Sequence, residues 1–203
     1  MTDARPPRAP STINVNLSRR QLRDPKLLNR IVHALALASL DPVMLCLEIA
    51  EQTLVDDLME IAGVLRALRD LEVRLAIDDF GAGATSLALL REIPVDVLKL
   101  DQSFIRPLAG DQHEDQDIVA ALTALAHRLG LTVTAEGIET SEHLDAVRRA
   151  GCDQRQGFLL GRPLPAYEVL DLLSRGTLVA APVALWNATS HLATEVEPVR
   201  VVS

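Results

Sequence analysis

The sequence predicts an α/β fold of the TIM type, a (β/α)8 barrel in which about six of the eight strands are present. Short apolar stretches alternate with amphipathic helical stretches from Ser11 onward, which is typical of βαβ units and a parallel sheet. The apolar 48% of the chain is mostly Leu, Val, Ala and Ile, with only one Trp, one Tyr and three Phe. Aliphatic cores of this kind suit helices packed on a parallel sheet. A complete barrel needs about 250 residues, so 203 residues indicate an incomplete one.

Six apolar runs of four to seven residues are the predicted strands. Their length is that of a buried barrel strand. In chain order they are Thr12 to Leu17, Val43 to Ile49, Val73 to Ile77, Val97 to Leu100, Leu131 to Ala135, and Gln156 to Leu160.

Four of the intervening segments carry helix signals. Asp24 followed by Pro25 predicts an N-cap with proline at the first helical position. Gly130 and Gly151 are predicted to end the third and fourth helices. Apolar residues recur at spacings of three and four along the first three, which are Leu28 to Leu35, Leu58 to Leu68 and Ile118 to Leu129, and the shorter fourth is Ser141 to Ala150.

Three regions are expected along the chain. Residues 1–10 contain three prolines and no apolar signal region, and they are predicted to be a disordered leader. Residues 11–176 form the partial barrel, and residues 177–203 lose the alternation and are predicted to be a loosely ordered tail. No apolar run reaches the ~20 residues of a membrane span, so no membrane insertion is expected.

Composition excludes several classes of function. A net charge of −8 argues against binding DNA or RNA, whose phosphates require a basic surface. Two cysteines offer neither a CxxC pair nor a disulfide framework, and they favour a cytoplasmic protein. None of the five histidines has the spacing of a zinc ligand.

Polar residues suited to metal or phosphate chemistry stand at or near the strand ends. The carboxyl ends of parallel barrel strands converge on one face, where such barrels place their active sites. Carboxylate oxygens are ligands that hard divalent cations prefer. The converging residues are Asn16, Glu48, Asp78, Asp79, Lys99, Glu136 and Gln156.

Several of these residues have a second interpretation. Asp78 or Asp79 could cap a following helix, and Asn16 could end its strand through an Asx turn. A carboxylate at position 48, inside an apolar strand, requires a metal or a lysine beside it. Lys99 could equally form a structural ion pair with one of the acids.

Several longer motifs contain these residues and occur in a fixed order between about Ser11 and Leu173. They are Val15-Asn16-Leu17-Ser18, Leu47-Glu48-Ile49 with Glu51, Asp78-Asp79-Phe80-Gly81, Pro94-Val95-Asp96 leading into Leu98-Lys99-Leu100-Asp101, Ala135-Glu136-Gly137 with Glu139, and Gly151-Cys152-Asp153 leading to Gln156-Gly157. Together they resemble the EAL-type cyclic di-GMP phosphodiesterase domain of bacterial signal transduction. The resemblance implies hydrolysis of cyclic di-GMP to linear pGpG by two-metal, in-line water attack.

The resemblance also implies roles for individual residues and partners. Two Mg²⁺ or Mn²⁺ ions per site, a homodimer, and an upstream sensory or diguanylate cyclase domain in a full-length protein are expected. By position, the resemblance implies that one metal is held by Asn16, Glu48 and Asp78 and the second by Asp78, Asp79 and Glu136. It implies that Lys99, Glu136 and Asp79 are catalytic, with Lys99 orienting the attacking water. Gln156 and Asp101 would support the substrate, and Glu51, Gly81 and Gly83 would anchor the loop after Asp79.

The sequence departs from the family pattern in two places. It has no Glu-Ala-Leu segment upstream of Asn16, and it has Ala82 and Ala84 where the family usually has threonine and an aromatic residue. An N-terminally incomplete domain with impaired hydrolysis is therefore expected. A noncatalytic cyclic di-GMP-binding or regulatory module is the alternative function, and a nonfunctional remnant is a third interpretation.

Overall fold

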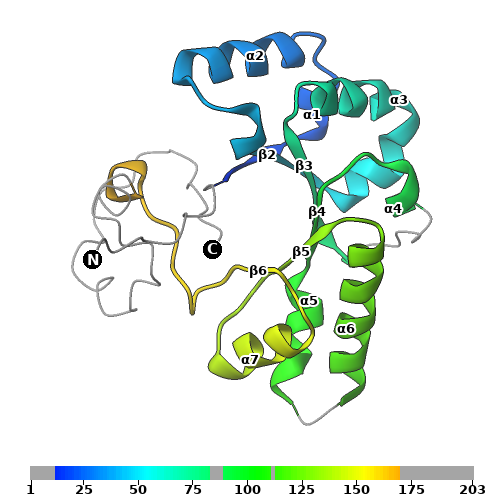
Figure 1. Ribbon diagram of the computed structural model, residues 1–203, viewed down its shortest axis with the longest axis vertical. Coiled ribbons are helices and arrows are strands. Elements are labelled where there is room, and N and C mark those ends of the chain that lie inside the picture. Colours follow the sequence, from blue (N-terminus) through cyan, green and yellow to red (C-terminus); the bar gives the residue numbers. More distant parts are fainter. Residues whose placement is uncertain (1–11, 83–88, 111–112, 170–203) are drawn as a thin grey trace, which may run out of the picture.

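A computed structural model describes residues 12–82, 89–110 and 113–169 of the chain (Figure 1). Its centre is a six-stranded, all-parallel sheet in which each strand pairs with the one before it in the chain. Sequential order with parallel pairing is the arrangement of a (β/α) barrel, so the predicted six-stranded partial barrel is confirmed. The strands are β1 (Ile13–Leu17), β2 (Leu45–Ala50), β3 (Arg74–Phe80), β4 (Val97–Leu100), β5 (Thr132–Ala135) and β6 (Gln154–Arg155).

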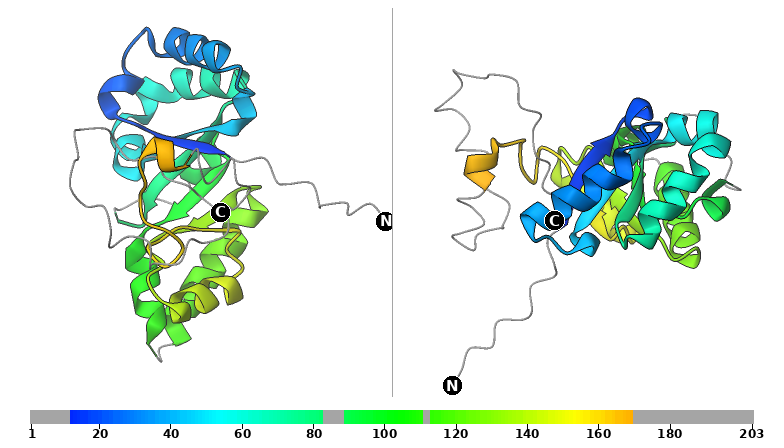
Figure 2. Two further views of the ribbon diagram at one scale, coloured as in Figure 1. Left: turned by 90° about the vertical axis from the view of Figure 1, so that its left-hand side faces the viewer. Right: turned by 90° about the horizontal axis from the view of Figure 1, so that it is seen from above.

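Helices connect the strands and lie around the outer side of the sheet (Figures 1 and 2). The predicted amphipathic helices correspond to the four longest. The helical elements are α1 (Arg19–Leu22), α2 (Leu27–Ala38), η1 (Pro42–Met44), α3 (Glu51–Asp70), α4 (Leu89–Glu92), α5 (Gln102–Ile105), η2 (Arg106–Ala109), α6 (His113–Arg128) and α7 (Ser141–Arg149).

The two faces of the sheet differ in chemistry because side chains alternate along each strand. Leu47, Ile49 and Leu75 are at most 2% exposed and belong to the large aliphatic core under the helices. Among the described residues, the opposite, inner face carries a smaller buried apolar cluster of Cys46, Ala76 and Val97. Burial raises the pKa of the Cys46 thiol to about 12, so this cysteine behaves as a small apolar side chain. Glu48, Asp78 and Lys99 of the inner face lie nearer the carboxyl ends of the strands, whereas Arg74 is the first residue of β3 and stands opposite Cys46.

The structure corrects three predicted strands. β2 begins at Leu45 rather than Val43, because Val43 and Met44 belong to η1. β3 does not stop at Ile77 but continues through both aspartates to Phe80, because its pairing with β4 resumes after an irregularity. The sixth strand is Gln154–Arg155 rather than Gln156 to Leu160. After residue 156 the chain turns, with the amide of Leu160 donating to the carbonyl of Gly157. A Cβ at Gly157 would lie 2.2 Å from the backbone of Ile138, so only glycine allows this close approach.

One predicted helix start is also wrong. α2 begins at Leu27, and Asp24 instead accepts a hydrogen bond from the Lys26 amide (2.9 Å) in the preceding turn. The predicted glycine stops are confirmed, because Gly130 and Gly151 both take positive φ angles two residues after the last residues of α6 and α7. Glycine adopts this conformation without steric cost.

The predicted leader (1–10) and tail (177–203) lie outside the described residues, as does Gly83. Among the helices that the structure describes, none combines the length and apolar character needed to cross a bilayer.

Candidate functional site

A buried lysine lies at the centre of the inner face. Lys99 of β4 is completely buried, with Nζ 2.8 Å from Glu48 Oε1, 2.5 Å from Asp78 Oδ1 and 2.8 Å from Glu136 Oε1. One acid each from β2, from β3 and from the residue after β5 therefore lies beside the ammonium group of Lys99 on β4. Glu48 is thus buried beside a lysine, and Lys99 forms ion pairs with three acids; the metal-binding role of Glu48 and the catalytic role of Lys99 stay predictions.

The charges of this cluster depend on one another. Burial by itself lowers the pKa of Lys99, but the attraction of Glu136, Asp78 and Glu48 outweighs it, and the net pKa is raised. Lys99 is therefore protonated at neutral pH. Burial raises the pKa of Glu136, and the nearby Lys99 charge reverses only part of that effect. Glu136 Oε1 lies close to the ammonium without hydrogen-bond geometry, so its negative charge is incompletely compensated.

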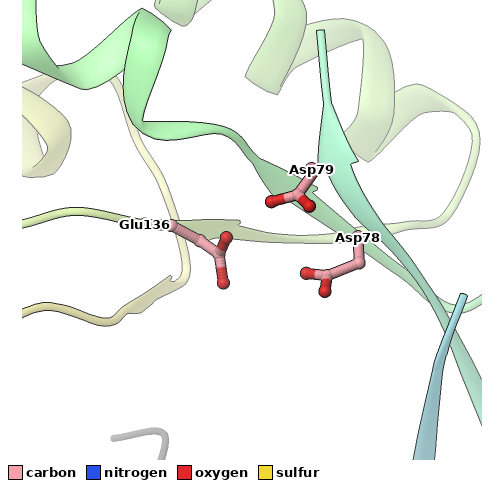
Figure 3. Close-up of side chains that lie close together, drawn as sticks. All are labelled: Asp78, Asp79 and Glu136. Atoms are coloured by element: carbon pink, nitrogen blue, oxygen red, sulfur yellow. The ribbon is translucent and has the colours of Figure 1, made fainter. Parts of the chain in front are cut away.

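A bulge explains how two adjacent aspartates serve one site. Ile77 pairs with Leu98 and Phe80 pairs with Leu100, so β3 has one more residue than β4 over this interval. Asp79 adopts φ 55°, in the left-handed region that aspartate tolerates better than most residues. In a regular strand, neighbouring side chains point to opposite faces. The bulge removes this alternation, and both carboxylates point towards Glu136 (Figure 3).

The three carboxylates are arranged in a way that fits a divalent cation. One oxygen each from Asp78, Asp79 and Glu136 all lie within 4.8 Å of one another. Asp78 and Glu136 are at most 9% exposed, and buried acids at such separations repel unless a cation compensates them. Oxygen donors of this type suit Mg²⁺ and Mn²⁺.

The loop that follows the aspartates is tied to α3. Glu51 is 3% exposed, and its Oε2 accepts a 2.7 Å hydrogen bond from the Gly81 amide. Gly81 has φ +99°, and a Cβ there would lie 1.9 Å from Phe104 Cε2. Position 81 therefore requires glycine on both backbone and packing grounds. The contact agrees with the predicted anchor through Glu51 and Gly81.

Three other predicted site residues lie around this centre. Asn16 is exposed and stands opposite Glu48 in the β1–β2 ladder. Gln156 directly follows β6, and its Oε1 is buried without a hydrogen-bond partner in the described part of the chain. Asp101 accepts a hydrogen bond from the Ser103 amide (2.9 Å) at the start of α5. This bond uses one of the two carboxylate oxygens of Asp101. Its predicted role in supporting the substrate stays a prediction.

Sequence reasoning missed one residue of the cluster. Asn14 Nδ2 donates a 2.9 Å hydrogen bond to Glu48 Oε1. The available signal was the alternation along β1, since residues two apart share a face of a strand. Asn14 therefore lies on the same face as Asn16, one step deeper in the sheet.

Comparisons with known proteins all point to the same protein family. The sequence model of the family described as "EAL domain" matches residues 1–163. Two curated proteins of Pseudomonas aeruginosa are similar. The bifunctional diguanylate cyclase/cyclic di-GMP phosphodiesterase MucR is 42% identical over 78% of this chain. The cyclic di-GMP phosphodiesterase NbdA is 39% identical over 84% of it. The chain spans only 23% and 22% of the length of these two relatives.

Solved structures show the same relationship. The EAL domain of Mycobacterium smegmatis DcpA has a TM-score of 0.75 at 38% identity, covering 81% of this chain and 74% of that one. A complex of Klebsiella pneumoniae BlrP1 with manganese and cyclic di-GMP has a TM-score of 0.69 at 34% identity, covering 75% of this chain and 39% of that one. These likenesses agree with a partial barrel of the same fold.

Proposed function

Because this chain belongs to the EAL domain family, we propose that it hydrolyses one phosphodiester bond of cyclic di-GMP to give linear pGpG. The observation that carries the proposal is the convergence of Asp78, Asp79 and Glu136 beside the buried Lys99 at the carboxyl ends of the strands. This is the rim at which barrels of this type place their chemistry. The relatives whose names include this activity are similar over 78% and 84% of this chain.

The donor set supports divalent metal use, with Mg²⁺ or Mn²⁺ as the proposed ions. Asp78, Asp79 and Glu136 would hold one cation, and Asn16, Glu48 and Asp78 would hold the second. When bound, such ions lower the pKa of a coordinated water and neutralise charge on phosphate oxygens. Lys99, together with Glu48, Asp78 and Glu136, would then position the attacking water and the phosphodiester.

Lys99 is proposed to orient the attacking water through Nζ. A protonated Nζ would donate a hydrogen bond to that water, as it does to Asp78. Glu136 is proposed to be catalytic through its place beside Lys99 and next to Asp78 and Asp79. The buried and unpartnered Gln156 Oε1 is proposed to support the substrate.

The decisive experiment is to incubate the purified chain with cyclic di-GMP and Mn²⁺ and to measure pGpG by chromatography. We expect product with the wild type, and loss of product with Lys99→Ala. The matched control is Lys26→Ala, since Lys26 is the other lysine of the sequence and lies exposed at the start of α2. Absence of pGpG from the wild type at all Mn²⁺ concentrations would overturn the proposal.

A noncatalytic cyclic di-GMP-binding module is the second candidate. Ala82 and Ala84 favour it, because they stand where the resembling family usually has threonine and an aromatic residue. Calorimetry would select this function if cyclic di-GMP bound tightly and no pGpG formed.

The proposed assembly is a homodimer within a longer protein that carries a sensory or diguanylate cyclase domain. The small share of MucR and NbdA that this chain spans supports a multidomain setting. Light scattering of the purified chain tests the dimer, and a monomeric mass at assay concentration would contradict it.

A further inference from the structure

Asn14 and Lys99 both contact the same oxygen of the buried Glu48 carboxylate. Asn14 Nδ2 lies 2.9 Å from Glu48 Oε1, and Lys99 Nζ lies 2.8 Å from the same oxygen. Glu48 is 1% exposed, so its orientation depends on these protein contacts. Both donors use Oε1, and Oε2 is the oxygen that neither of them occupies.

We propose that Asn14 is a positioning residue that orients Glu48 for cation binding, an inference that rests on the proposed function. By holding Oε1 from β1, Asn14 fixes the carboxylate so that Oε2 is available as a ligand. Partners that orient metal-binding carboxylates in this way typically change metal affinity or activity about 10- to 100-fold when removed.

The chemistry of an amide suits this task. A buried carboxylate needs donors to compensate its desolvation, and Lys99 is already shared with Asp78 and Glu136. A second cation at position 14 would lower the negative charge that attracts a divalent ion. An amide donates a hydrogen bond without adding charge, so it restrains Glu48 and leaves the attraction for the metal intact.

The placement of Asn14 in β1 supports a positioning role over a ligand role. Asn14 pairs with Cys46 and Asn16 pairs with Glu48 in the ladder between β1 and β2. Asn14 is thus two residues, about 7 Å along the strand, further from the rim than Asn16. It reaches Glu48 diagonally across the ladder, from the strand position opposite Cys46.

The test measures Mn²⁺ affinity directly, by electron paramagnetic resonance of free Mn²⁺ in titrations without substrate. Asn14→Val removes the donor and keeps a residue that favours strands. Asn14→Gln keeps an amide on a longer stem. Asn29→Ala is the matched control, because Asn29 is exposed on α2. We expect Asn14→Val to weaken Mn²⁺ binding about 10- to 100-fold, Asn14→Gln to recover part of the loss, and the control to match the wild type.

Thermal unfolding in EDTA separates positioning from stability. The proposal predicts that the affinity loss of Asn14→Val persists at temperatures where the metal-free variant is fully folded. Wild-type Mn²⁺ affinity in Asn14→Val, or an equal loss in Asn14→Gln, overturns the proposal. If the wild type binds Mn²⁺ but forms no pGpG, the proposed function fails while the comparison of Asn14 variants still decides this inference.

Discussion

Replacing Lys99 by methionine is expected to destabilise the metal-free protein strongly. The substitution keeps a long side chain but removes the charge that lies within 2.5 to 2.8 Å of three carboxylates. Removing one partner of a buried ion pair costs about 3 to 5 kcal/mol, because an uncompensated charge stays buried. For a protein of this size, that loss corresponds to a decrease in Tm of about 6 to 20 °C.

Divalent cations should reverse much of this loss. Without Lys99 the pKa of Glu136, already raised by burial, rises further, and the acids either take up protons or bind a cation. A ligand that binds only the folded state at 100 times its Kd stabilises by about 2.7 kcal/mol. We therefore expect Mn²⁺ to raise the Tm of Lys99→Met by more than it raises the Tm of the wild type.

The assay is thermal and urea unfolding followed by circular dichroism, first in EDTA and then in Mn²⁺. Lys26→Met is the control, and it should unfold within about 0.5 kcal/mol of the wild type, as exposed substitutions usually do. An unfolding free energy of Lys99→Met within about 1 kcal/mol of wild type in EDTA would refute the reasoning. Such a result would mean that the folded state does not need the Lys99 charge to compensate the three buried acids.

Three further predictions address the loop, the bulge and the acid stability. Gly81→Ala should lower both Tm and pGpG formation, because its Cβ would overlap Phe104 and its φ is +99°. Asp79→Gly should retain the folded stability, since glycine accepts the left-handed backbone, while Mn²⁺ affinity measured by titration falls at least about tenfold. Asp153→Asn should lower stability near pH 6, and by progressively less as the pH falls below about 4, measured by urea midpoints. Burial raises the pKa of Asp153, but hydrogen bonds from the Val133 amide and from His127 outweigh this effect and keep the pKa below its usual value.

The sign of the pH effect follows from the lowered pKa. The stabilisation by Asp153 is fully present above the unfolded-state pKa of about 3.9 and is lost as the pH falls through the lower, folded-state value. The difference between wild type and Asp153→Asn should therefore narrow on acidification, and a difference that widens would contradict the assignment.

Matched controls exist for the other two substitutions. Gly63→Ala lies at an exposed position of α3 with no atom within 4 Å of the new Cβ, and it should stabilise by up to about 1 kcal/mol. Equal changes in Tm for Gly81→Ala and Gly63→Ala would show that Phe104 does not exclude a Cβ at position 81. For the bulge, Asp79→Val is the contrast, because a β-branched residue is strained at positive φ, and it should unfold more easily than Asp79→Gly.

Much of the fold follows from local patterns in the sequence. The alternation of apolar runs and amphipathic segments predicts parallel strands in chain order, and the glycines after α6 and α7 mark their ends. The sixth strand was misplaced because the apolar run after Gln156 follows a close backbone approach at Gly157, and no hydrophobic period reports such a contact.

The sequence by itself determined which chemical groups reach the carboxyl rim, since parallel strands in sequential order bring their ends to one side. Only the tertiary structure decided how those groups pair. The bulge that turns Asp78 and Asp79 to one face, the three acids that share Lys99, and the bond from Asn14 to Glu48 all depend on the register between neighbouring strands. Register results from pairing and packing across the whole sheet, so a strand's own residues do not specify its neighbours' contacts.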